Sequence, residues 1–416
     1  MEYSVDNLFD VIVVGAGIMG SCAAYEIAKR GFRVLLLEQF DFLHHRGSSH
    51  GESRTIRATY PEPYYPPLVM KSISLWEQAE SESGYKVYFQ SPQLDVGPVN
   101  NKSLQAVIQN CRLHSIRHRV LDATQVHQEF AGLIRLPDNW IGVVSEVGGV
   151  VKPTKAVSMF QALALKRGAV LKDNMEVKSI ERDEGGGRIV VSTADGQNFW
   201  CQKCVVTAGA WTSKLVRSNK SLATELPIKP LETAAFYWRI KEGYENEFTI
   251  GGGFPSFASY GHPYLYGTPS LEFPGLFKIG FHGGRACDPD QRSWAVSPAA
   301  VESVKEWIKQ IMGDRVDSSG PVMTQSCMYS MTPDEDFVID FLGGDWGKSV
   351  VVAGGFSGHG FKMGPVVGRM VADLVLTGEA KGVDLRHYRV TRFEGNPKGN
   401  VKDFEKQVSS GSNQQH

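Results

Sequence analysis

The stretch VIVVGAGIMGS, residues 11–21, decides the fold of this chain, because an apolar run ends there in the pattern G-x-G-x-x-G. A helical pattern over residues 21–30 follows it, and a second apolar strand over residues 34–37 ends at Glu38. This order is typical of the βαβ unit that binds a dinucleotide. Gly15 permits the tight turn, Gly17 lets the backbone approach a pyrophosphate, and Gly20 lets the helix pack closely on the strand.

Two further features of this unit predict a bound dinucleotide. The N-terminus of the helix offers unpaired N–H groups and the positive end of its dipole to phosphates. Glu38 lies eighteen residues after Gly20, close to the ~20 expected for a carboxylate that binds the ribose hydroxyl. A glycine-rich turn without a ligand, which is the alternative, would not need strand, helix, second strand and acid in this order.

Length and composition predict a globular protein with more than one domain. A chain of 416 residues is long enough for two domains. The formal net charge of -1 does not favour nucleic acid or an anionic membrane as a partner. No uninterrupted apolar run reaches the ~18 residues that a membrane span needs, and the apolar stretch near the N-terminus is the first strand rather than a secretory signal.

The cysteines predict neither a disulfide framework nor a metal site. Six cysteines in a chain of this length are typical of a reducing compartment. Cys201 and Cys204 form a C-x-x-C pattern, but no second pair and no histidine stands at zinc spacing.

A second strand–glycine–helix unit lies near the other end of the chain. A strand over 349–353 leads into a glycine-rich turn over 354–360 and a helix over 363–376. Between the two units, residues 226–284 are rich in β-formers and aromatic residues broken by Gly and Pro, which predicts an antiparallel sheet. We also expect a basic loop over 42–60 and a helix over 70–81.

We therefore expect an α/β fold with an α+β insert, in which a discontinuous Rossmann-type nucleotide domain is interrupted by a mixed or antiparallel sheet that holds the substrate. The predicted nucleotide domain comprises residues 1–85, 150–222 and 325–395. The predicted substrate domain comprises residues 86–149 and 223–324. The polar stretch 396–416 is expected to be a flexible tail.

Three segments could carry chemistry, each with a structural alternative. The glycine-rich turn 354–360 leads into a helix whose N-terminus could stabilise negative charge on a reduced cofactor, with Lys362 as a cation beside it. The alternative is a structural turn followed by a solvated lysine. Arg57 could bind a carboxylate in bidentate fashion, or it could belong to a basic surface loop. Lys278, Gly280 and His282 alternate and so share one face of a strand, which could point inward or toward solvent. Spacing alone gives Cys327 no special role.

Taken together, these segments resemble the monomeric sarcosine oxidase and N-methyltryptophan oxidase family, which includes the peroxisomal pipecolate oxidases of eukaryotes. The resemblance covers residues 10 to about 393. It rests on five motifs in order: VIVVGAGIMG, GSSHGESRTIRATY, TAGAW, CMYSMTPDEDFVID and AGGFSGHGFKMGPVVG.

The resemblance implies a cofactor and its attachment. Members of the family hold FAD through a thioether from a cysteine in a C-M-Y-T-x-T-x-D-E motif, where this chain has Cys327 and carries Ser330 in place of the usual threonine. His50 and Arg54 would lie near the isoalloxazine ring. The segment GFSGHGFK, residues 355–362, matches the family motif completely, so Gly355, Gly358 and Gly360 would contact the cofactor.

The resemblance also implies substrate-binding and catalytic residues. Arg57 and Lys362 would bind the substrate carboxylate, and Lys278 would lie over the flavin and activate oxygen. His282 matches the histidine four residues after that lysine. Tyr266 matches a tyrosine of the substrate pocket, although its spacing to Lys278 is one residue longer than in the bacterial members.

The activity implied is that of an FAD-dependent amine oxidase, which converts sarcosine and O2 into glycine, formaldehyde and hydrogen peroxide. L-pipecolate or another secondary amino acid is an alternative substrate on the same fold. A flavin-binding protein without turnover and a dehydrogenase with a protein acceptor are alternatives of other classes. The resemblance further implies a monomer and a peroxisomal location, but the chain ends in NQQH rather than an S-K-L type tripeptide, so a cytosolic location stays open.

Overall fold

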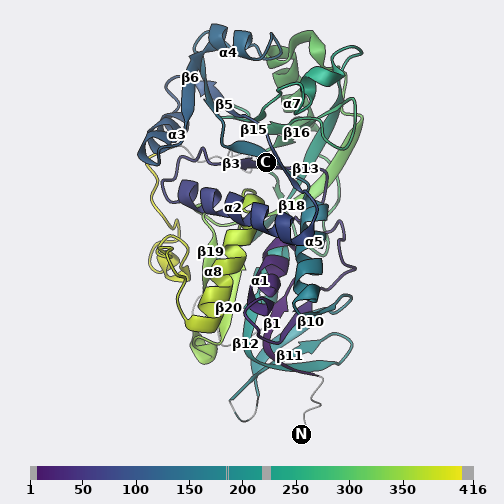
Figure 1. Cartoon of the computed structure of the whole chain (residues 1–416), viewed down its shortest axis with the longest axis vertical. Helices are drawn as coiled ribbons and strands as arrows, with labels where there is room; N and C mark the ends of the chain where they lie inside the picture. The colour runs from purple at the N-terminus through teal and green to yellow at the C-terminus, as the bar shows by residue number, and fades with distance from the viewer. Residues whose placement is uncertain (1–6, 184, 186, 218–225, 405–416) are drawn as a thin grey trace, which may run out of the picture.

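The computed structural model describes residues 7–183, 185, 187–217 and 226–404. These residues form one sheet of eight strands, one of nine and a small one of three. In Figure 1 the eight-stranded sheet lies in the lower half of the molecule and the nine-stranded sheet in the upper half. The expected α/β fold with a second mixed sheet is confirmed.

The eight-stranded sheet joins both ends of the chain. β1 (Leu8–Val14) pairs in parallel with β2 (Val34–Leu37) on one side and with β12 (Asn198–Val206) on the other. β12 in turn pairs in parallel with β20 (Val350–Gly354), so the two strand–glycine–helix units belong to one sheet, as predicted. The other strands are β9 (Val170–Lys172), β10 (Val177–Arg182), β11 (Ile189–Thr193) and β19 (Val338–Phe341).

Helices cover one face of this sheet. α1 (Ile18–Ala28) packs between α5 (Pro153–Lys166) and α8 (Gly364–Thr377). The close approach of α1 and α8 depends on Gly368, where a Cβ would lie 2.5 Å from the Cβ of Cys22. Because the strands are buried on both faces, they read as continuous apolar runs rather than as alternating ones.

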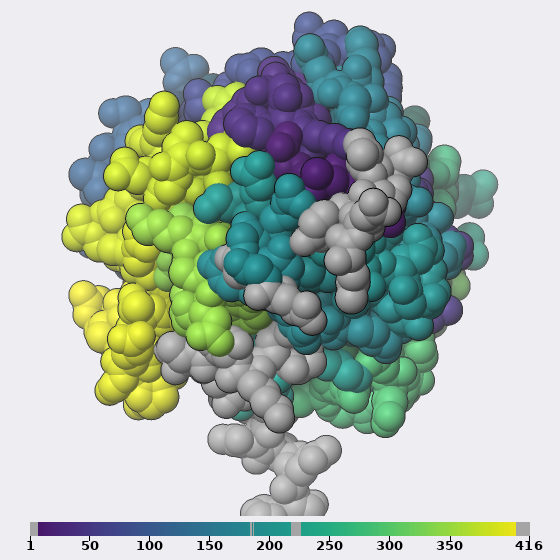
Figure 2. All heavy atoms as spheres, turned by 90° about the horizontal axis from the view of Figure 1, so that it is seen from below, coloured from purple at the N-terminus to yellow at the C-terminus, as the bar shows by residue number. Residues whose placement is uncertain are grey.

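Figure 2 shows the lower end of the molecule, where N-terminal (purple), middle (teal) and C-terminal (yellow) parts of the chain meet on one surface. Such mixing supports a nucleotide domain built from separate stretches. The exact boundaries stay predictions, and the one at 222/223 lies outside the described residues.

The nine-stranded sheet has one apolar face and one face that carries polar side chains. Its strands are β6 (His118–Asp122), β7 (Trp140–Ser145), β5 (Gln93–Pro98), β14 (Ser256–Ser259), β15 (Leu265–Thr268), β16 (Leu276–Phe281), β13 (Lys229–Arg239), β17 (Arg285–Ala286) and β18 (Met323–Met331). Leu94, Phe257 and Ile279 pack on one face against α7 (Pro298–Ile311). The predicted antiparallel pairing holds along β13, β15 and β16, but β14 pairs in parallel with β5.

The segment 42–60, predicted as a loop, contains a strand. β3 (Arg54–Arg57) pairs with β8 (Gly148–Val151), which also pairs with β4 (Tyr88–Gln90). The basic composition of β3 hid a pairing that the distant, apolar β8 supplies. The helix predicted over 70–81 is α2 (Tyr65–Ser83), which starts earlier because prolines fit its first positions and which ends at Gly84 with φ +82°. The remaining helices are α3 (Lys102–Leu113), α4 (Ala123–Glu129) and α6 (Thr212–Arg217).

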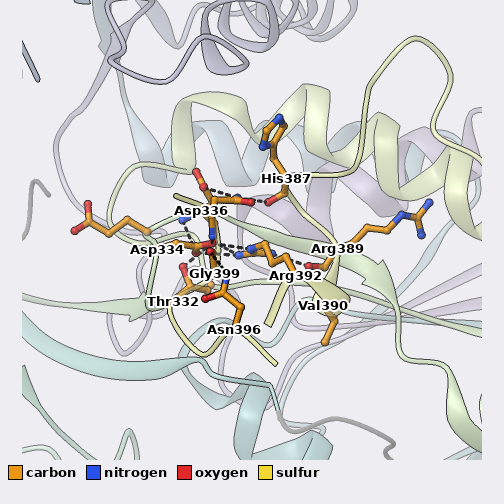
Figure 3. A network of polar contacts seen from close by, with 12 residues as sticks. Thr332, Asp334, Asp336, His387, Arg389, Val390, Arg392, Asn396 and Gly399 are labelled. Carbon is orange, nitrogen blue, oxygen red and sulfur yellow. Dashed lines mark hydrogen bonds and ion pairs between the residues drawn. The ribbon is translucent and has the colours of Figure 1, made fainter. Parts of the chain in front are cut away.

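The start of the segment predicted as a flexible tail is fixed by polar contacts, while residues 405–416 lie outside the described part. Figure 3 shows Asp334 and Asp336, in the loop after β18, among side chains of the C-terminal segment. Arg392 donates to both oxygens of Asp334, over 2.8 and 3.1 Å, and the backbone N of Asn400 donates to Asp334 as well. Lys402 forms ion pairs with Glu62 and Asp336. A polar composition hid these contacts, because the partners are buried acids far away in sequence.

Arg392→Met is expected to lower the free energy of unfolding by about 3–5 kcal/mol, because it leaves the buried Asp334 carboxylate without its partner. The two side chains are 5% and 0% exposed. Denaturant unfolding measures the change. Arg386→Met is the matched control, because the side chains of Arg386 and Asp384 are 76% and 52% exposed and such pairs contribute at most about 1 kcal/mol. Equal losses of unfolding free energy in both variants would contradict a stabilising role of the buried pair of Arg392 and Asp334.

Candidate active site

A cavity of about 420 Å³ runs from the first glycine turn to the polar face of the nine-stranded sheet. Most of the predicted site residues line it: Gly15, Gly17, Glu38, Arg54, Arg57, Tyr266, Lys278, His282, Cys327, Gly358, Gly360 and Lys362. Gly20, His50 and Gly355 lie behind its wall. The fold thus brings residues from both sheets and both ends of the chain to one space.

The nucleotide end of the cavity is a close-fitting turn. Gly15 has φ +98°, and a Cβ there would lie 2.6 Å from the carbonyl oxygen of Thr207. A Cβ at Gly20 would lie 1.8 Å from the carbonyl oxygen of Gly15, so both positions require glycine. Glu38 Oε2 accepts a hydrogen bond from the N–H of Ala16 over 2.9 Å. Glycines without side chains, a helix N-terminus and a carboxylate together fit a dinucleotide cofactor.

The other end of the cavity is lined by a row of residues that runs across the nine-stranded sheet. Directly paired positions place these side chains on one face: Ala258 (β14), Tyr266 (β15), Gly280 (β16), Ala235 (β13) and Gln325 (β18). Three members are small, so the row leaves room above the sheet. A Cβ at Gly280 would lie 2.5 Å from the hydroxyl oxygen of Tyr266, so glycine makes space for that ring.

Lys278 and His282 point into the cavity, which resolves the two alternatives left open by the sequence. Lys278 is 3% exposed, and its Nζ donates to the carbonyl oxygen and to the hydroxyl of Ser53 over 2.7 and 3.0 Å. Burial, and secondly the charge of Arg54, lowers the pKa of Lys278 to about 7. Burial also lowers the pKa of His282 to about 3. Lys278 is therefore poised to change charge near neutral pH, whereas His282 is neutral there.

Arg57 and Lys362 approach the cavity from different elements. Arg57, at the end of β3, is 6% exposed, and its Nη1 donates to the carbonyl oxygen of Thr59 and, over 3.3 Å, to the hydroxyl of Tyr260. Both bonds use Nη1, so among the described residues the Nε and Nη2 donors of Arg57 are left for a ligand. Lys362 Nζ donates to the hydroxyl of Tyr60 over 3.0 Å and to the carbonyl oxygen of His359 over 2.8 Å. These bonds take two of its three donors.

Tyr60 lies between these two cations. The Arg57 guanidinium stands 4.4 Å and Lys362 Nζ 5.4 Å from its ring centre. Burial, and secondly the charge of Arg57, holds the pKa of Lys362 well below its ordinary value. A ligand carboxylate would relieve this repulsion, so the pair is suited to binding an anion.

Cys327 lies on the cavity face of β18, two residues from Gln325 and next to Arg54 in space. Arg54 Nη2 is 3.8 Å from its Sγ, and the same guanidinium donates to the carbonyl oxygens of Ser48, His50 and Ser53. His50 is buried and stacks on His45 with ring centres 5.1 Å apart. Burial, and secondly the charge of Arg54, lowers the pKa of His50 to about 3. His50 therefore holds Arg54 through its backbone rather than lining the cavity with its ring.

The second glycine turn closes the cavity beside this strand. Gly358 has φ +79°, and a Cβ there would lie 2.7 Å from the ring of Tyr329. Ser357 ties the turn to β18, because its N–H donates to the carbonyl oxygen of Ser330 over 2.8 Å. The turn leads through a short 3-10 helix, Phe361–Met363, that carries Lys362.

Sequence reasoning gave no role to several residues that line or support the cavity. Tyr329 donates to the hydroxyl of Tyr266 over 3.3 Å, and Ser53 accepts hydrogen bonds from Lys278. The ring of Tyr264 lies 5.2 Å from that of His282 in a tilted arrangement. Tyr329 and Ser53 lie inside quoted motifs, so their position was a usable signal. Tyr60 ends another quoted motif and so had the same signal, whereas Tyr264 had none beyond its aromatic character.

Within the described residues no cluster of three or more potential metal ligands occurs, and no helix is long and apolar enough to cross a membrane. All six cysteines are free. The arrangement instead combines a dinucleotide cradle, a pair of cations for an anion and a buried lysine of lowered pKa.

Comparison with known proteins gives a consistent result. A family described as "FAD dependent oxidoreductase" matches residues 10–374. A "Probable sarcosine oxidase" of Arabidopsis thaliana is 60% identical over 411 residues, 98% of each chain. The "Peroxisomal sarcosine oxidase" of Homo sapiens is 33% identical over 392 residues, 93% of this chain and 97% of the human one. Among solved structures, NikD, "an unusual amino acid oxidase", has the same fold, with a TM-score of 0.78, 24% identity and coverage of 91% and 96% of the two chains.

Proposed function

This chain belongs to the family of FAD-dependent oxidoreductases, and on that premise we propose that it oxidises sarcosine to glycine, formaldehyde and hydrogen peroxide with O2 as the acceptor. One observation carries the proposal: Arg57, Lys362 and Lys278 reach one cavity that continues into the dinucleotide cradle. The names of the Arabidopsis and human relatives support sarcosine as the substrate.

Arg57 and Lys362 bind and orient the substrate in this proposal. Their charges hold the carboxylate, and each charge-assisted hydrogen bond contributes about 1.5–3 kcal/mol. Fixing the carboxylate fixes the direction of the C–H bond beside the nitrogen, which is the bond to be oxidised. The bound FAD supplies the two-electron acceptor for that bond. Water then hydrolyses the imine product.

Lys278 acts in the oxygen half of the reaction. Its Nζ holds a positive charge in a buried place, where it stabilises the negative charge that develops as oxygen is reduced. Ser53 fixes the direction of this ammonium through two hydrogen bonds. Tyr266 and His282 shape the space between this lysine and the anion site, and His282 contributes no charge there because its pKa is low.

The experiment that tests the proposal is a product assay on the purified yellow protein. Sarcosine should give formaldehyde and hydrogen peroxide in a 1:1 ratio. L-pipecolate should give hydrogen peroxide without formaldehyde, so the ratio of the two products separates the substrates. Absence of turnover with every secondary amino acid offered would contradict the proposal.

We further propose that FAD is attached covalently through Cys327, because this thiol lines the cavity beside the Arg54 cation. Acid-precipitated protein is expected to keep its yellow colour, and Cys327→Ser is expected to release all of its flavin to the supernatant. Cys287→Ser is the matched control, since Cys287 is also partly exposed but does not line the cavity. Flavin released from the unchanged protein would contradict the attachment.

Location and assembly complete the proposal. The human relative is named peroxisomal, and we propose the same location for this protein, which microscopy of the untagged full-length chain tests. The expected small-molecule partners are the secondary amino acid and O2. The monomeric state stays a prediction, to be checked by light scattering.

A further inference from the structure

A buried carboxylate lies close behind the anion site without a role in the proposed reaction. Asp95, on β5, is fully buried. Its Oδ1 accepts a hydrogen bond from Gln93 Nε2 over 3.1 Å, and the nearby hydroxyl of Thr59 also favours its charged form. A buried carboxylate in this condition costs folding free energy, so its presence calls for a reason.

The register of the sheet places Asp95 on the cavity side. Asp95 pairs directly with Ala258, which lines the cavity and is the first member of the row described above. Its neighbours Leu94 and Val96 belong to the apolar cluster on the opposite face. Since successive side chains alternate, the Asp95 carboxylate faces the same side as Tyr266 and Gly280, one strand beyond the cavity wall.

Asp95 also stands close to Arg57 through Tyr260. The hydroxyl of Tyr260 accepts from Arg57 Nη1 over 3.3 Å, and the N–H of Tyr260 donates to the carbonyl oxygen of Val96, next to Asp95, over 2.7 Å. The two charges interact electrostatically without forming a direct ion pair among the described residues. Arg57 therefore lies between the Asp95 carboxylate, whose charge it feels, and the open cavity that it lines.

We propose that Asp95 is a specificity-determining residue, which weakens the attraction of the anion site for net-anionic ligands and so selects amino acids of zero net charge over simple carboxylates and dicarboxylates. The inference rests on the proposed function, since it assumes that Arg57 and Lys362 bind a carboxylate. A zwitterion feels little net repulsion from Asp95, because its two charges oppose each other. A monoanion feels the full repulsion, and a dianion about twice as much.

The direction in which Asp95→Asn changes the affinity for anions separates a role in specificity from a structural role. Asp95→Asn keeps the shape and the hydrogen bond from Gln93, and it removes the charge. Acetate binding should therefore become tighter by about tenfold, and malonate binding by more, as expected for the loss of a repulsion across several ångströms in a protein interior. The KM for sarcosine should change far less than either dissociation constant.

The pH dependence of anion binding provides a second readout. Burial raises the pKa of Asp95 to about 6, against the opposing charge of Arg57. As the pH falls through 6, Asp95 takes up a proton, the repulsion ends, and acetate should bind more tightly. The groups around Asp95 stay in one charge state here: Arg57 is always charged, burial raises the pKa of Cys111 to about 12, and burial raises those of Tyr60, Tyr260 and Tyr264.

Two lysines of the cavity also change charge, and the variant separates their effect. Protonation of Lys278, whose pKa lies near 7, and of Lys362 would also strengthen acetate binding as the pH falls. Both lysines remain in Asp95→Asn. The proposal therefore predicts that acetate binding in Asp95→Asn keeps the pH dependence caused by the lysines and loses the part centred near pH 6 that Asp95 causes in the unchanged enzyme.

The test measures acetate, malonate and sarcosine on the holoenzyme. Dissociation constants for the two anions come from the change they cause in the absorption spectrum of the bound flavin, between pH 5.5 and 8.5. Tyr260→Phe is the control, because it removes a contact to Arg57 without changing any charge and should weaken the binding of anions and sarcosine alike.

Three outcomes decide the question. Tighter acetate binding in Asp95→Asn, with a nearly constant KM for sarcosine and a flatter pH profile, supports the proposal. Unchanged or weaker acetate binding in this variant, with normal binding in the unchanged enzyme, overturns the role of Asp95 alone. Failure of the unchanged enzyme to bind acetate or malonate at any pH overturns the anion site and the role of Asp95 together.

Discussion

Lys278→Met is expected to slow the reaction of the reduced enzyme with oxygen by roughly a thousand-fold, and to change the rate of flavin reduction by sarcosine far less. A cation about 4 Å from a developing anion, at an effective dielectric constant of ~20, contributes ~4 kcal/mol, which is roughly a thousand-fold in rate. Stopped-flow mixing of reduced enzyme with oxygenated buffer measures the first step, and anaerobic mixing with sarcosine measures the second.

The pH dependence of the oxygen step gives the same residue a second test. Because the pKa of Lys278 is lowered to about 7, the fraction of enzyme with a charged Lys278 falls as the pH rises above 7. The rate of reoxidation in the unchanged enzyme should fall over the same range, and Lys278→Met should be slow at every pH. Equal slowing of both half-reactions in the variant would rule out the assigned role.

Arg57→Met and Lys362→Met are each expected to raise the KM for sarcosine by about tenfold or more, because each removes a charge-assisted hydrogen bond worth about 1.5–3 kcal/mol. Both residues line the cavity and are tied to Tyr60. Steady-state kinetics with sarcosine and with a carboxylate-free secondary amine measure the effect, which should be absent for the amine.

The matched control for this pair is Lys309→Met, on the exposed side of α7, where the lysine pairs with Glu306 at the surface. This variant should leave the KM unchanged, since surface charges are screened by salt. An unchanged KM for sarcosine in both Arg57→Met and Lys362→Met would contradict the carboxylate site.

Local patterns sufficed for the nucleotide half of the fold. The glycines at 15, 17 and 20 and the strand at 34–37 lie as the sequence indicates, because turn geometry and apolar periodicity are properties of short stretches. The alternation of Lys278 and Gly280 correctly predicted a shared face of β16, and His282, directly after this strand, lines the same cavity as Lys278. The direction of that face was open, because it depends on how β16 packs against α7 rather than on β16 itself.

Contacts between distant segments account for what the sequence left out. β3 requires a partner strand more than ninety residues later, at Gly148–Val151. The role proposed for Asp95 depends on two residues distant in sequence. Arg57 belongs to a different sheet, and Ala258 lies on β14, which pairs in parallel with β5. Lys402 is fixed by Glu62, at the other end of the chain. No local pattern of residues predicts such contacts between distant segments.

Anaerobic mixing of the purified yellow protein with sarcosine tests the central claim most directly, with L-pipecolate, L-proline, N-methyltryptophan and glycine as comparisons. The account predicts rapid bleaching of the flavin absorption near ~450 nm by sarcosine, with glycine, a primary amine, far slower. Persistence of the absorption with every secondary amino acid, while flavin stays bound, would contradict amine oxidation and with it the assignment of Arg57 and Lys362.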